Sequence, residues 1–135
     1  MKKKFMQLSL LAIVIATASC KKSNNDNPHP LPAERTVKFV LYTTKDFSNQ
    51  STGIRFTLKI TANNTTVWDS VMAPMQLKNI PGPNNKIIIE KKVPAGNSER
   101  LVAGFNYYLE NVGSSWYMDI IEPTEAAKTI DYNFQ

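Results

Sequence analysis

Residues 54–61 read IRFTLKIT, an unbroken alternation of apolar and polar side chains. Successive side chains of a β-strand point to opposite faces of a sheet, so this period of two predicts a half-buried strand. An amphipathic helix would repeat its apolar residues with a period of about 3.6 instead. The apolar members are Ile54, Phe56, Leu58 and Ile60, and the polar members are Arg55, Thr57, Lys59 and Thr61. We therefore expect a strand with one face in a core and the other in water.

Similar alternation continues along the chain and predicts about seven strands. Its apolar sets are Val37, Phe39 and Leu41; Leu101, Ala103, Phe105, Tyr107 and Leu109; Trp116, Met118 and Ile120, which alternate with Tyr117, Asp119 and Ile121; and Ile130, Tyr132 and Phe134. Between the sets, Asn63-Asn64 suits a tight hairpin, and the stretch 111–114 is predicted to join two strands. This spacing is typical of an all-β fold, an antiparallel β-sandwich, and both immunoglobulin-like and transthyretin-like topologies fit it.

The run Ile87-Ile88-Ile89 differs from these sets because it is apolar at every position. Such a run is expected of a central strand that is covered on both faces, or of a strand that touches a partner. Both interpretations stay open.

The N-terminus has the features of an export signal. Three lysines at positions 2–4 precede an apolar run from Leu8 to Ala18, about half the roughly 20 residues needed to cross a bilayer. Small residues at 17–19 then lead to Cys20, the single cysteine of the chain. A cysteine in this place resembles the acylated first residue of a bacterial lipoprotein, and cleavage at an ordinary signal site is the alternative. The resemblance implies a lipid anchor on Cys20, and Lys21 in place of aspartate implies the outer membrane.

We expect three parts along the chain: a signal peptide over residues 1–19, the lipidated cysteine with a proline-rich tether over 20–32, and a β-sandwich domain over 33–135. The formal charge of +5 lies mostly before the domain, because residues 33–135 hold eleven basic and ten acidic side chains. Nucleic-acid binding needs basic residues gathered on one face and is therefore not expected.

Short stretches of the domain carry a further resemblance. The stretches FVLYT at 39–43, WDS at 68–70 and DYNF at 131–134 are similar to those of small Bacteroidota outer-membrane lipoproteins. The resemblance implies a β-sandwich on a lipid anchor and carries no known catalytic or binding residue.

Residue types that perform catalysis or bind metals are scarce. The single histidine, His29, lies in the tether, and Cys20 is assigned to the lipid. The domain therefore has no cysteine nucleophile, no histidine to act as a base, and no set of cysteines and histidines to bind zinc. Asp119, Glu122 and Glu125 lie close in sequence, but acids at turns and strand ends are usually only solvated. We expect no enzyme activity, no cofactor and no metal site.

Adjacent aromatic residues are the remaining candidates for a binding surface. In Tyr107-Tyr108 and Trp116-Tyr117, one member of each pair is expected in the core and the other in solvent. If Tyr108 and Tyr117 pair across a hairpin, they form an exposed patch that could stack on a sugar or bind a protein. Ordinary cross-strand packing is the alternative. Tyr108 and Tyr117 are therefore the candidate ligand or partner contacts.

These observations favour a lipid-anchored, non-enzymatic binding module of the cell envelope that holds a protein or glycan at the membrane surface. A structural or accessory subunit of a larger outer-membrane uptake or assembly complex is the alternative, with residues 87–89 as its contact strand. The expected location is the outer membrane, on its periplasmic face or at the cell surface, and the membrane itself is a partner through the anchor.

Overall fold

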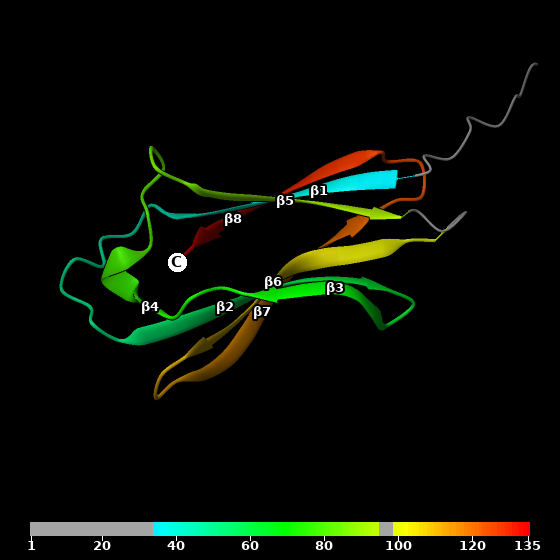
Figure 1. The fold of residues 1–135 in the computed structure, drawn as a ribbon. Coiled ribbons are helices and arrows are strands. Elements are labelled where there is room, and N and C mark those ends of the chain that lie inside the picture. Colours follow the sequence, from blue (N-terminus) through cyan, green and yellow to red (C-terminus); the bar gives the residue numbers. More distant parts are fainter. Residues whose placement is uncertain (1–33, 95–98) are drawn as a thin grey trace, which may run out of the picture.

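The computed structural model describes residues 34–94 and 99–135, and these form two packed β-sheets (Figure 1). The smaller sheet has the order β5-β1-β8, and the larger has the order β3-β2-β6-β7 with the short β4 paired to β2. The strands are β1 (Glu34–Thr43), β2 (Gly53–Ala62), β3 (Thr65–Val71), β4 (Met75–Gln76), β5 (Ile87–Pro94), β6 (Leu101–Leu109), β7 (Gly113–Ile121) and β8 (Ala127–Phe134). The predicted β-sandwich is confirmed. The predicted signal peptide, Cys20 and the tether with His29 lie outside the described residues.

The centre of the smaller sheet is β1, which runs antiparallel to β5 and parallel to β8. Parallel neighbours need a long connection, and here the chain between β1 and β8 forms β5 and the whole of the larger sheet. Because β1 and β2 lie in different sheets, the order is not that of an immunoglobulin constant domain, in which strands A and B share a sheet.

The core lies between the two sheets and is built by the predicted alternation. Ile54, Phe56, Leu58 and Ile60 are each at most 2% exposed, which confirms the inner face of β2. The rings of Phe39 and Phe56 meet Phe105 edge-on, with centroids 5.6 and 6.3 Å away. Burying one such side chain contributes about 1.5–3 kcal/mol to stability, so these three strands supply much of the free energy that holds the sheets together.

Two asparagine turns shape the larger sheet. Asn63 and Asn64 connect β2 to β3 with φ values of 48° and 64°, the backbone of a tight hairpin turn. Asn111, with φ of 61°, lies in the turn from β6 to β7, and Gly113 follows it with φ of 125°. Glycine adopts this conformation without steric cost, so β7 begins at Gly113.

The apolar run Ile87-Ile88-Ile89 lies in β5, at the edge of the smaller sheet. The expectation of a central strand is therefore wrong, because β1 occupies the centre and its Val40 is only 4% exposed. Ile87 and Ile89 pack against the core, whereas Ile88 lies opposite Val40 on the outer face and is 53% exposed. The alternative of a partner-contact strand is left open.

One end of the sandwich is closed by a short 3-10 turn, η1 (Leu77–Asn79), visible beside β4 in Figure 1. Leu77 and Ile80 are 5% and 6% exposed and belong to the core cluster. Among the described residues, no helix is both long and apolar enough to cross a bilayer.

Candidate functional site

An open hollow lies on the outer face of the larger sheet, the face turned away from the smaller sheet. Its volume is about 490 Å³, and it extends over β2, β6 and β7. The residues that line it are Arg55, Thr57, Asn106, Tyr107, Tyr108, Ser114, Ser115 and Trp116. Within the part of the chain that the structure describes, this lining contains one cation, Arg55, and no carboxylate.

Strand register explains why these side chains meet. In one row Arg55 pairs with Tyr108, which pairs with Ser114. In the next row on the same face, Thr57 pairs with Asn106, which pairs with Trp116. Tyr108 and Trp116 are therefore diagonal neighbours, whose Cα atoms are typically about 7–8 Å apart.

Two of the three aromatic residues that line the hollow are unusually exposed. Trp116 is 71% exposed and Tyr108 is 52% exposed, and neither ring stacks on another aromatic ring among the described residues. An aromatic side chain left in water forgoes the burial that would stabilise the fold. The faces of both rings are thus free to receive another group.

The polar members of the hollow are also uncommitted. Within residues 34–94 and 99–135, the side chains of Arg55, Thr57, Asn106 and Ser114 form no hydrogen bond or ion pair. The acid beside Arg55 is Glu110, which shares a neighbouring small hollow with it. The Gly53 N–H donates a hydrogen bond of 3.1 Å to the Glu110 carboxylate, so Glu110 is held by backbone and lies outside the lining of the larger hollow.

The predicted pairing of Tyr108 with Tyr117 is wrong. A turn over Asn111–Ser114 would set these tyrosines opposite each other, but β7 already begins at Gly113, and Tyr117 pairs with Phe105 instead. A change of register by an odd number of residues turns a side chain to the other face. Trp116 therefore takes the outer position that was expected of Tyr117.

Tyr117 lies at the rim between the two sheets. Its ring stacks on Tyr132 of β8, with centroids 4.8 Å apart and an interplanar angle of 10°. Tyr132 also lies 6.2 Å from the ring of Tyr107. Burial, followed by the hydrogen bond with Tyr107, raises the pKa of the Tyr132 hydroxyl above its usual value. This tyrosine group packs β6 and β7 of the larger sheet against β8 of the smaller sheet.

Sequence reasoning missed Trp116, Arg55 and Asn106 as members of one site. The polar face of β2 was predicted, and with it the outward position of Arg55. The missing information was the pairing of β2 with β6, which sets Arg55 beside Tyr108. The glycine in the 111–114 stretch was the available signal for an earlier start of β7, because Gly113 tolerates the positive φ found there.

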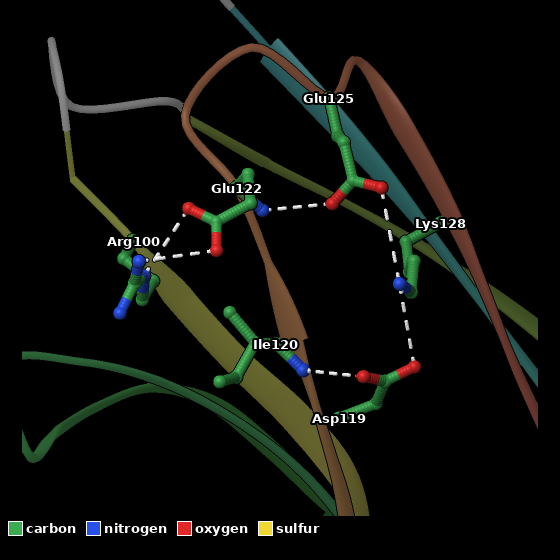
Figure 2. A network of polar contacts seen from close by, with 6 residues as sticks. All are labelled: Arg100, Asp119, Ile120, Glu122, Glu125 and Lys128. Atoms are coloured by element: carbon green, nitrogen blue, oxygen red, sulfur yellow. Dashed lines mark hydrogen bonds and ion pairs between the residues drawn. The ribbon is translucent and has the colours of Figure 1, made fainter.

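The acids Asp119, Glu122 and Glu125, which lie close in sequence, are found elsewhere, where β7 leads into β8 (Figure 2). The guanidinium of Arg100 approaches Glu122 at 3.1 Å, and Lys128 lies 3.3 Å from Asp119 and 3.8 Å from Glu125. The Glu122 N–H also donates a hydrogen bond of 2.7 Å to Glu125.

Each of these three acids therefore has a cation close to it. Among the described residues, no group of three or more histidines, cysteines or acids is arranged to hold a metal ion. Exposed ion pairs of this kind contribute about 0–1 kcal/mol each. These contacts therefore serve to hold the turn between β7 and β8 in place.

Comparison of the chain with protein-family models, curated proteins and solved structures returned no match. Any function proposed for the protein must therefore be argued from its residues and their geometry.

Proposed function

We propose that the protein is a lipid-anchored, non-enzymatic binding module of the cell envelope, and that the hollow on the outer face of its larger sheet holds the partner. The observation that carries the proposal is the exposure of Trp116 and Tyr108 beside polar side chains that have no partner among the described residues. The partner is a glycan or a protein.

The contrast with the acidic cluster supports this choice of site. Asp119, Glu122 and Glu125 are each paired with Arg100 or Lys128, so an incoming ligand would have to displace existing contacts. In the hollow, by contrast, a ligand gains contacts without displacing any from the described residues. Exposed tryptophan, tyrosine and arginine are also the residue types that most often carry the binding energy of interfaces.

The proposed anchor gives this site its place at a membrane. A buried acyl chain contributes about 0.8 kcal/mol per methylene, and one chain alone binds only marginally. Bacterial lipoproteins, which the N-terminus resembles, carry more than one chain on the cysteine. Replacing Cys20 with alanine is expected to move the exported protein from the membrane fraction to the soluble fraction, as measured by fractionation and immunoblotting.

The binding role is tested by recovering the membrane-extracted, full-length protein with whatever is bound to it. Bound proteins are identified by mass spectrometry and bound glycans by sugar analysis. We expect Trp116→Ala to lose most of the bound material. Ile120→Ala is the matched control, because Ile120 is a large exposed apolar residue on the same strand and face, outside the lining of the hollow. Equal recovery by Trp116→Ala and the unchanged protein contradicts the proposal.

A second function is favoured by the exposed edge of β5. Ile88 is 53% exposed there, and edge strands offer unpaired backbone groups to another chain. This arrangement fits an accessory subunit of a larger outer-membrane complex. Loss of a co-purifying protein on Ile88→Lys, with no loss on Trp116→Ala, supports the subunit role over the binding module.

A further inference from the structure

We infer that the hollow binds an acidic sugar residue, with a pyranose ring stacked on Trp116 and a carboxylate paired with Arg55. The inference rests on the proposed function and names the chemistry of the partner. It follows from the arrangement of the lining, its charge and its size.

The arrangement of the lining favours a sugar over a protein surface. The middle of a protein–protein interface is usually its most apolar part, and the rim is polar. The hollow has no apolar middle, because Asn106 lies beside Tyr108 on the central strand β6, and Arg55, Thr57 and Ser114 flank them in the two adjacent rows. A pyranose matches this mixture of side chains, because its C–H face packs on an aromatic ring while its hydroxyls meet polar groups.

The charge of the lining favours an acidic ligand. Among the described residues that line the hollow, Arg55 is the single ionic side chain, and Glu110 beside it accepts a hydrogen bond from the Gly53 N–H. The next cation along β2 on the same face is Lys59, which lies opposite Asp69 of β3. Arg55 is instead paired with Tyr108 and forms no ion pair among the described residues, and its planar fork of donors fits a carboxylate in two parallel hydrogen bonds.

The size and openness of the hollow favour a sugar within a chain. Small-molecule sites usually measure about 300–1,000 Å³, and the hollow, at about 490 Å³, lies in the lower part of that range. Because it lies open on a sheet face, a polysaccharide can pass across β6 and β7 without a free end. We therefore expect recognition of internal residues of an acidic glycan.

Isothermal titration of the full-length protein in detergent tests the inference. The probes are trisaccharides of galacturonate, glucuronate and mannuronate, each beside its methyl ester, which keeps the ring and removes the charge. We expect at least one acid form to bind about tenfold more tightly than its ester, since the ester cannot form the two parallel charge-assisted hydrogen bonds with Arg55. Binding of the acid form should weaken as salt increases.

Two pairs of variants assign this preference to residues. Arg55→Gln is expected to abolish the preference for the acid form, while Lys59→Gln, which removes a charge from the same face outside the hollow, keeps it. Trp116→Ala is expected to weaken both forms at least tenfold, as the loss of a central tryptophan does in interfaces. Ile120→Ala, on the same strand and face, is its control. Thermal melts of each variant confirm that it folds.

The outcomes separate the inference from the proposed function. Equal binding of acid and ester, or a preference that survives Arg55→Gln, overturns the acidic ligand and leaves the binding module standing. If none of the sugars binds and a protein is recovered in a Trp116-dependent way, the sugar is overturned and the binding role stands. If neither the binding of the sugars nor the amount of recovered material depends on Trp116, both the inference and the proposed function are overturned.

Discussion

Neighbouring aromatic residues of β6 and β7 have opposite surroundings. Tyr107 and Tyr117 face the smaller sheet and contact the ring of Tyr132, whereas Tyr108 and Trp116 face solvent on the hollow. The two pairs have similar chemistry, and within each strand their members are adjacent. The difference teaches that one face of this sheet packs its aromatic rings against the other sheet, while the opposite face presents aromatic rings to solvent.

The largest loss of stability is expected from a substitution on the inner face of the larger sheet. Phe105 is 1% exposed, and its ring lies 5.6 Å from that of Phe39 and 5.5 Å from that of Tyr132. Phe105→Ala removes contacts to both sheets and leaves a cavity, so we expect a loss of about 3–5 kcal/mol in the free energy of unfolding. Urea denaturation followed by tryptophan fluorescence measures it. A loss below about 1 kcal/mol contradicts the packing described for this core.

A smaller effect on stability is expected at Gly104, where the backbones of β6 and β7 lie close together. Gly104 of β6 lies opposite Met118, and a Cβ there would collide with the Tyr117 carbonyl oxygen and lie 2.8 Å from the Met118 Cα. Gly104→Ala should push β7 away and cost about 1–3 kcal/mol. Gly82→Ala is the control, because a Cβ on Gly82 has no neighbour within 4 Å. If both variants melt alike, β7 does not approach β6 as closely as described.

The inner tyrosines also predict a dependence of stability on pH. The pKa of Tyr132 is raised from its ordinary value of 10.0, first by burial and then by the hydrogen bond with Tyr107. A raised pKa means that the folded state keeps a proton that the unfolded state releases, so this contribution to stability is complete below pH 10.0 and declines above it.

Removal of this hydroxyl tests the effect. Tyr132→Phe should show a flatter decline of the free energy of unfolding above pH 10.0 than the unchanged protein, in urea titrations at a series of pH values. Parallel curves for the two proteins over this range would show that the Tyr132 hydroxyl is not linked to folding.

The same comparison shows how far sequence alone could reach. Alternation predicts which residues share a face, and burial confirms it for β2 and for the Leu101–Leu109 strand. In β7 the two alternating sets, Trp116-Met118-Ile120 and Tyr117-Asp119-Ile121, are both largely apolar. Hydrophobicity therefore does not decide which set faces the core, and the start of the strand at Gly113 decides it.

The order of the strands in each sheet could not be predicted from the local sequence pattern either. The parallel pairing of β1 with β8 joins the two ends of the described domain, and no turn or spacing specifies it. The hollow depends on a similar long-range fact, because Arg55 and Tyr108 meet only through the pairing of β2 with β6. Tyr108 could be selected from the sequence as a candidate contact, but its assembly with Arg55, Asn106 and Trp116 into one site could not.

The smallest effect on stability is expected on the outer face. Trp116 is 71% exposed, so Trp116→Ala should change the free energy of unfolding by no more than about 0.5 kcal/mol. Tyr117→Ala, one residue further along, breaks the stack on Tyr132 at 4.8 Å and should cost more, by about 0.5–1.5 kcal/mol for the ring pair alone. Parallel urea titrations of the two variants give the difference.

This difference decides between the two interpretations of the outer aromatics. If Trp116→Ala costs as much as Tyr117→Ala, the indole stabilises the sheet by cross-strand packing, and its exposure no longer argues for a ligand. If Trp116→Ala leaves the free energy of unfolding unchanged, the fold does not require a tryptophan at this position. A large exposed ring that the fold does not need is best explained by a group that binds to it, and the loss of bound material on the same substitution then measures that role directly.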